Sequence, residues 1–181
     1  MLHLKNITAG NPKTAEQYQM TKRHSIVWLF SEDGRNWYEE QKNFASDTIK
    51  VAYNEKGRVV WVGKDVTGIE PTNVSIIELP DITANRRITA PGFWFYRNDE
   101  FVFDHKLKAE DERDALLKQV SIMTSDWEKD LLLGLISDED REKLKAYRIY
   151  AKSLQAMDFS TITDKTSYNA INWPERPDAA A

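Results

Sequence analysis

The chain has 181 residues, a net charge of −4 and 41% hydrophobic residues, which suits one or two small packed domains and argues against general disorder. It contains no cysteine, so disulfides, thiolate zinc sites and cysteine nucleophiles are excluded. No run of lysine or arginine stands out, which argues against nucleic acid or an anionic membrane as the main partner. No segment fits a signal peptide or a membrane span, so we expect folding in a cytoplasm.

Short strands separated by turns are predicted over the first 105 residues. Thr14-Ala15-Glu16-Gln17 matches a capping box, which predicts a short helix ending near Lys22. Three hairpins and one further strand are expected after it, because runs rich in β-branched and aromatic residues alternate with turn sequences. The expected hairpins span residues 26–38, 49–62 and 93–103, and the single strand spans residues 74–79.

Beyond residue 105 the spacing of apolar residues becomes helical. One helix is predicted over residues 109–133, ended by Gly134, because glycine takes the left-handed conformation of a helix C-terminus without strain. Ser137 is expected to begin a second helix that runs to about Met157. A link this short predicts an antiparallel helical hairpin. The apolar face of the first helix is formed by Leu116, Val120, Met123, Trp127 and Leu131.

These elements predict an α+β fold with three parts. Residues 1–105 are expected to form a β-rich domain of short antiparallel hairpins, and residues 106–157 the helical hairpin. Residues 158–181 are expected to form an extended tail, because proline lacks the backbone donor that a helix or a central strand requires.

No pattern of residues indicates catalysis. The three histidines, His3, His24 and His105, lie far apart in the sequence without metal-ligand spacing. The carboxylates of 138–140 are explained by the favourable charge that they place at a helix N-terminus. We therefore expect no enzyme activity, no metal and no cofactor.

Aromatic residues of the β-rich domain are the first candidates for binding a partner. Several predicted strands are apolar on both faces, and such strands need either a second layer of the same domain or another protein. Tryptophan and tyrosine are common anchors of protein interfaces, and a sugar-binding platform is a further alternative. The candidate partner-binding residues are Trp28, Phe30, Trp37, Tyr38, Trp61 and Trp94. Of these, we expect Trp28, Trp37, Tyr38 and Trp61 to be exposed.

The helical hairpin supplies a second set of candidates. Its apolar faces are explained in the first place by packing of the two helices on each other. Apolar residues away from the shared stripe could instead cover a neighbouring subunit or the β-rich domain. The candidates for oligomerisation are Trp127, Leu132, Ile149 and Tyr150.

Two groups of motifs resemble a known family. Trp127, the link Leu133-Gly134-Leu135-Ile136-Ser137 and the pair Tyr150-Ala151 resemble the C-terminal domain of the tail fibre assembly proteins of tailed bacteriophages. Segments at the other end resemble the assembly proteins of Mu-type phages of enteric bacteria. These segments are residues 3–19, 32–41 and 80–87.

The resemblance implies a chaperone for a trimeric tail fibre, acting in the cytoplasm of the host bacterium during virion assembly. It implies that the N-terminal domain grips the C-terminal region of the fibre and that the helical domain promotes multimerisation, with self-association as one form of it. A second hypothesis is a subunit that stays on the virion fibre and contributes to host recognition by binding surface glycan. A third, a small glycan hydrolase, has no supporting motif, because its carboxylate pair would have to be assembled from scattered residues.

Overall fold

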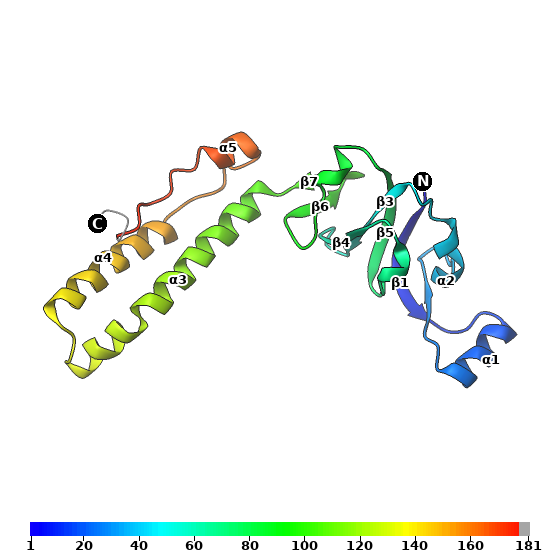
Figure 1. The fold of residues 1–181 in the computed structure, drawn as a ribbon, viewed down its shortest axis with the longest axis horizontal. Coiled ribbons are helices and arrows are strands. Elements are labelled where there is room, and N and C mark those ends of the chain that lie inside the picture. Colours follow the sequence, from blue (N-terminus) through cyan, green and yellow to red (C-terminus); the bar gives the residue numbers. More distant parts are fainter. Residues whose placement is uncertain (178–181) are drawn as a thin grey trace. The chain divides into compact units, whose positions relative to one another are not determined.

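The computed structural model describes residues 1–177 and has an α+β fold. The chain divides into two compact units, Met1–Phe103 and a second that begins at Asp104. The first unit is built on antiparallel strands and the second on helices (Figure 1). The last four residues of the predicted tail, 178–181, lie outside the described residues.

A five-stranded antiparallel sheet with the order β2-β1-β5-β3-β4 forms the body of the first unit. The prediction of the second hairpin and of the strand at 74–79 is confirmed. The strands are β1 (His3–Gly10), β2 (Trp28–Phe30), β3 (Thr48–Asn54), β4 (Val59–Gly63) and β5 (Val74–Pro80).

Strand β1 was not predicted, although it lies between β2 and β5. Its pairing with β5 shifts register between Leu4 and Ile7, and Asn6 within this irregularity has a φ of 46°. Leu4 and Ile7 are both fully buried although they are three residues apart. A strand normally buries every second residue, so the bulge removes the alternation by which strands are recognised.

The first predicted hairpin is wrong. Strand β2 pairs with β1, and residues 36–38 return to it only through an isolated bridge between Phe30 and Asn36. The Asn36 side chain accepts a hydrogen bond from the backbone N–H of Tyr38 at 3.0 Å and so caps the short helix α2 (Trp37–Glu40). The predicted start of helix α1 (Ala15–His24) is confirmed, because Thr14 accepts from the N–H of Gln17 at 3.1 Å.

The last predicted hairpin is confirmed as β6 (Trp94–Arg97) and β7 (Glu100–Phe103), which pair only with each other as a sheet. The N–H of Tyr96 donates to the carbonyl of Gly57 at 2.7 Å and so joins this hairpin to the turn between β3 and β4. A Cβ at Gly57 would clash with the carbonyl oxygen of Tyr96, and Gly57 has a φ of +78°. Only glycine fits this turn.

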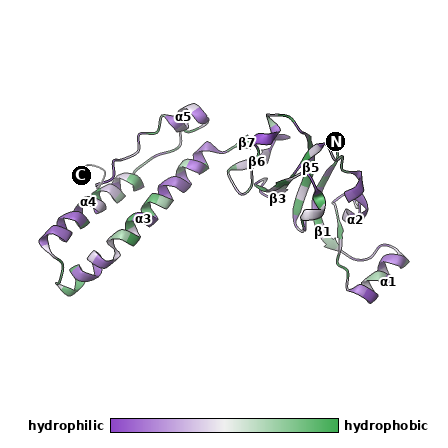
Figure 2. Ribbon diagram, viewed as in Figure 1, coloured by the Kyte–Doolittle hydropathy of each residue, from purple (hydrophilic) through white to green (hydrophobic). Residues whose placement is uncertain are grey.

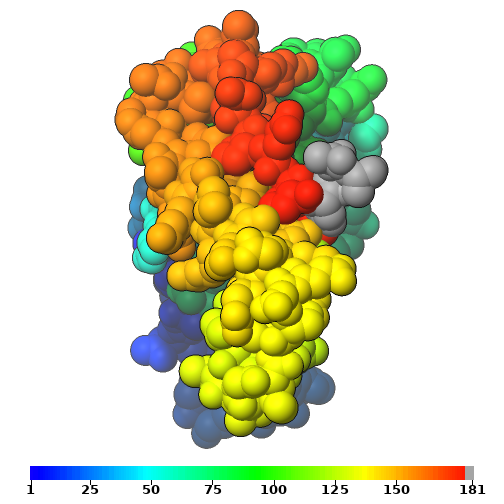
Figure 3. All heavy atoms as spheres, turned by 90° about the vertical axis from the view of Figure 1, so that its left-hand side faces the viewer, coloured from blue at the N-terminus to red at the C-terminus, as the bar shows by residue number. Residues whose placement is uncertain are grey.

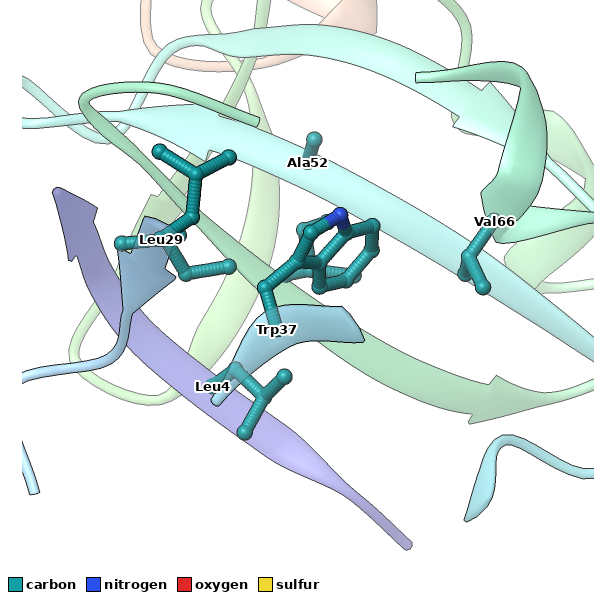
Figure 4. Close-up of a cluster of buried hydrophobic side chains, with 7 residues drawn as sticks. Leu4, Leu29, Trp37, Ala52 and Val66 are labelled. Carbon is teal, nitrogen blue, oxygen red and sulfur yellow. The ribbon is translucent and has the colours of Figure 1, made fainter. Parts of the chain in front are cut away.

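Hydrophobic clusters cover both faces of the main sheet. On one face the indole of Trp37 packs among side chains from the strands (Figure 4). The other face holds a cluster of Ile49, Val51, Val59 and Ile88. The strands that are apolar on both faces are therefore covered largely by the unit itself. Three short 3-10 helices lie in its connections: η1 (Gln41–Asn43), η2 (Val66–Gly68) and η3 (Asn85–Arg87).

The second unit contains the predicted helical hairpin. Helix α3 (His105–Leu133) begins four residues earlier than predicted, because the Asp104 side chain caps it by accepting from the N–H of Leu107 at 2.9 Å. Gly134 ends it with a φ of 69°, and Ser137 caps α4 (Asp138–Gln155) by accepting from the N–H of Asp140 at 3.1 Å. Both caps are as predicted.

The tail is not simply extended. It contains a short helix, α5 (Lys165–Asn169), which Asp164 caps. The rings of Phe159 and Trp173 lie 5.7 Å apart, and Trp173 packs against the core shared by α3 and α4. The tail therefore belongs to the core of the second unit. The prediction missed this because the residues that hold the tail in place are isolated aromatics without periodicity.

Candidate partner-binding surfaces

An apolar groove lies on the first unit between α1, β2 and α2. It has a volume of about 430 Å³. Val27 and Tyr38 are its most exposed residues, at 60% and 45%, whereas Trp28 is only 8% exposed. Exposed apolar surface gathered in one place is typical of a site that another protein covers. The groove is lined by Met20, Ile26, Val27, Trp28 and Tyr38.

Hydrogen bonds hold the two aromatic rings of the groove in place. The indole N–H of Trp28 donates to Thr21 Oγ1 at 2.8 Å and to the carbonyl of Gln17 at 3.2 Å. The Tyr38 hydroxyl donates to the carbonyl of Val27 at 2.8 Å, and its ring meets the Trp28 ring edge-on at 5.7 Å. A partner would therefore meet aromatic surfaces that are already ordered, so binding would cost little side-chain entropy.

Only Tyr38 among the six candidate partner-binding residues is substantially exposed. Trp37 is 1% exposed and lies in the core, so the expectation of an exposed anchor is wrong there. The reason is the cap at Asn36, which starts a helix that turns the indole inward. Phe30 is also buried, beneath the ammonium of Lys13 at 4.1 Å.

Trp61 and Trp94 are half-buried and each packs on a core cluster. Trp94 also meets the ring of Phe103 at 5.4 Å. The structure thus brings Trp28 and Tyr38 together and leaves the other candidates elsewhere in the unit. Met20 and Val27 were missed as candidates, because they join the lining of the groove only through the placement of α1 and α2 beside β2.

A second, more polar pocket of about 520 Å³ also includes Tyr38 in its lining. Its aromatic residues are Tyr38 and Phe44. Asp65 accepts hydrogen bonds from the N–H and the hydroxyl of Thr67 at 2.9 and 2.8 Å, which lower the pKa of its carboxyl. The pocket lining therefore includes a carboxylate and several lysines. Its other lining residues include Gln41, Lys42, Ser46, Lys50 and Lys64.

Lys50 and Glu78 are two buried charged residues with a structural role. They face each other across β3 and β5 and are 1% and 5% exposed. Burial raises the pKa of Glu78, but hydrogen bonds from the N–H of Leu2, the hydroxyl of Thr48 and the N–H of Ala45 outweigh it and lower the pKa. The ammonium of Lys50 donates to the carbonyls of Ala45 and Thr48. Across residues 1–177, no three His, Asp or Glu side chains cluster as a metal site would require.

The four candidates for oligomerisation fall into two groups. Leu132 and Ile149 are 86% and 66% exposed, as expected for residues away from the shared stripe. Tyr150 is only 6% exposed and belongs to the hairpin core, so the expectation that it lies off the stripe is wrong. Trp127 is half-buried, with its ring 6.0 Å from that of Tyr147.

The hairpin tip carries exposed leucines that were missed as candidates. Leu133 and Leu135 are 70% and 72% exposed and flank Gly134. Figure 2 shows hydrophobic, green ribbon at the turn between α3 and α4. The run Leu131-Leu132-Leu133 contains the signal for this exposure, because consecutive residues point 100° apart around a helix and cannot all face one partner helix. No helix described within residues 1–177 combines the length and apolar character needed to cross a membrane.

Residues 39–178 match the family model described as "Caudovirales tail fibre assembly protein, lambda gpK", and the chain belongs to this family. It is 43% identical to the tail fiber assembly protein U' of Escherichia phage Mu, over 98% of this chain and 100% of the relative. It is 44% identical to the protein of the same name from Escherichia phage P1, with the same coverage. A probable tail fiber assembly protein of Escherichia phage P2 is 38% identical, over 98% of this chain and 99% of the relative.

Proposed function

We propose that this chain is a chaperone that binds the C-terminal region of a phage tail fibre and promotes its folding and trimerisation in register. The protein acts in tail fibre assembly, as the family and the names of its relatives indicate. The observation that carries the finer proposal is the ordered, apolar groove at Trp28 and Tyr38. It has the chemistry of a protein-docking site and lies in a unit that offers no cluster of metal-ligating residues within the described chain.

In this proposal the groove takes an apolar side chain of the fibre. Tyr38 and Val27 are exposed and lose contact with water on binding, while Trp28 forms the ordered floor. Burying apolar surface contributes about 25 cal/mol per Å², so a few such side chains supply a useful affinity. The binding free energy biases the route of assembly, and no catalytic step is required.

Binding at one end of the fibre would also address the problem of register. Repetitive strands can pair one or more repeats out of step at little local cost. A chaperone that gathers the chains at their C-terminal region makes pairing begin at one defined place. The helical hairpin contributes by self-association through Leu132 and Ile149, whose exposure leaves them available for contact with a neighbouring subunit. We propose that fibre assembly with this chain takes place in the host cytoplasm. Retention of the chain on the virion fibre after assembly is the alternative to its release.

Co-expression with the cognate fibre tests the proposal. The fibre expressed alone should aggregate or remain monomeric, and co-expression with this chain should yield soluble trimers that co-purify with it. A variant with Val27→Asp and Tyr38→Ala, both at exposed positions, should fold and fail to rescue the fibre. The matched control is Ile82→Ala, an exposed apolar site outside the groove lining. Equal yields of native trimer with and without the chain would contradict the proposal.

A second candidate function is glycan binding by a subunit that stays on the fibre tip. The polar pocket beside Tyr38 favours it, since aromatic rings next to amide, hydroxyl and charged groups can hold a sugar by stacking and hydrogen bonds. Binding of the purified chain to host surface polysaccharide, lost on Phe44→Ala and Gln41→Ala, would support this function. Unchanged binding by folded variants would reject the pocket as its site.

A further inference from the structure

Helix α4 has opposite charges at its two ends. Its first five residues, 138–142, include four carboxylates and one arginine, whereas the stretch from Lys143 to Gln155 carries four basic residues and no carboxylate. The buried residues of the helix face α3, and the opposite, outward stripe contains Asp138, Glu142, Lys145, Ile149 and Lys152, all of them exposed. This stripe therefore runs from acidic to basic along its length.

Exposed apolar residues lie at both ends of this stripe. The leucines of the tip, among them Leu132 and Leu135, lie beside the acidic end, and Ile149 lies between the lysines of the basic end. Figure 3 looks onto the helical unit, with the tip and the first turns of α4 in yellow at the front. From Asp138 to Lys152 the helix rises about 21 Å at 1.5 Å per residue. Each end thus pairs an apolar contact with one sign of charge.

We infer that two copies of this chain associate through α4 in an antiparallel arrangement, with the acidic leucine tip of each copy against the basic Ile149 end of the other. An antiparallel pair matches opposite charges at both ends and covers apolar residues with apolar residues. A parallel pair would place carboxylates on carboxylates, which is unfavourable. The arrangement is a closed two-fold interface, since the same surface serves both subunits.

Other occupants fit this surface less well. An anionic bilayer would be repelled by the carboxylates that surround the leucines. The ion pairs within α4 are exposed, including Glu139 with Lys143 at 2.6 Å and Glu142 with Lys145 at 2.6 Å. Such pairs contribute little within one copy, so their charges can be shared with a second copy at small cost. This inference deepens the self-association part of the proposed function and rests on it.

Charge reversal in the purified full-length chain tests the inference without any fibre present. One variant carries Lys145→Glu and Lys152→Glu, which makes the stripe acidic throughout, and the other carries Asp138→Lys and Glu142→Lys, which makes it basic. Each alone should dimerise at least ten-fold more weakly than the wild type in sedimentation velocity. An equimolar mixture of the two should form heterodimers, because opposite charges then meet at both ends. The matched charge control is Lys56→Glu with Lys165→Glu, which should dimerise like the wild type.

The wild-type chain also provides a test that needs no substitution. Its dimer should weaken by about ten-fold or more between low and high salt, because exposed charge pairs are screened. A wild type that stays monomeric, folded variants that dimerise normally, or a mixture that stays monomeric would each overturn the inference. If a monomeric wild-type chain still rescued the fibre, the antiparallel dimer would be overturned and the chaperone role would stand. Failure of the dimer can therefore be distinguished from failure of the proposed function.

Discussion

The imidazole Nε2 of His3 lies 2.7 Å from the hydroxyl oxygen of Tyr53. The ring of Tyr96 stacks on Tyr53 at 4.6 Å and meets the His3 ring edge-on at 5.7 Å. This cluster joins β1 and β3 of the main sheet to β6 of the separate hairpin. Burial, and after it the positive charge of Lys5, lower the pKa of His3 below its usual value of 6.5.

The stability of the first unit should therefore fall on mild acidification. Below about pH 6.5 the unfolded chain binds a proton at His3 more readily than the folded chain does. The contribution of His3 to the free energy of unfolding is therefore fully present above that pH, and it is lost as the pH falls through the lower pKa of the folded state. Urea midpoints measured at pH 7.5 and 5.5 should differ, and His3→Gln should reduce the difference. His24→Gln is the control, because that histidine is exposed. An unchanged pH dependence in the His3 variant would count against this account.

Tyr38 should contribute more to fibre binding than to stability. Removal of an exposed interface anchor costs about 2 kcal/mol of binding free energy, roughly thirty-fold in affinity. Tyr38→Ala should show this loss in a titration against a C-terminal fibre fragment, with an unchanged circular dichroism spectrum. Tyr38→Phe keeps the ring and should bind nearly normally. Normal affinity in a folded Tyr38→Ala variant would show that the fibre binds elsewhere.

Trp37 should behave as a core residue. Truncation of a buried tryptophan costs about 3–5 kcal/mol, so Trp37→Ala should lower the urea midpoint strongly or prevent folding. Tyr18→Ala, on the exposed face of α1, should change stability by no more than about 0.5 kcal/mol. A stable Trp37→Ala variant that had lost only fibre binding would show that Trp37 contacts the fibre and is not a core residue.

Leu132 and Ile149 should matter for assembly and not for folding of the hairpin. Both are exposed, so Leu132→Glu and Ile149→Glu should retain helical content. At a subunit contact the same changes bury an unpaired carboxylate, which is costly. The variants should still bind preformed fibre tips and fail to drive trimerisation in co-expression. A normal trimer yield from both would leave the hairpin without a role in multimerisation.

Trp173 should stabilise the helical unit from the tail. Its ring packs on Phe159 and on the core of the hairpin. Because it is half-buried, Trp173→Ala should cost about 1–3 kcal/mol, measured by thermal unfolding followed at 222 nm. Asn172→Ala, at the exposed neighbouring position, should have little effect. Equal stability of the two variants would mean that the tail is dispensable.

Elements that depend on neighbouring residues could be predicted from the sequence alone. Gly134 and Ser137 end and begin helices because they satisfy backbone groups within a few positions of themselves, and the turn before Gly57 joins β3 to β4 in the same local way. Family membership was equally accessible, since its motifs are short and contiguous.

Which surfaces are exposed follows from the tertiary fold and could not be predicted from the sequence. Strand β2 pairs with β1, and nothing in the sequence of β2 itself specifies this partner among the other strands. Trp28 is buried in that arrangement, while the helix that Asn36 caps turns Trp37 into the core and leaves Tyr38 at the groove. Burial depends on contacts between residues distant in the chain, and an aromatic residue looks the same in the sequence whether a core or a partner will cover it.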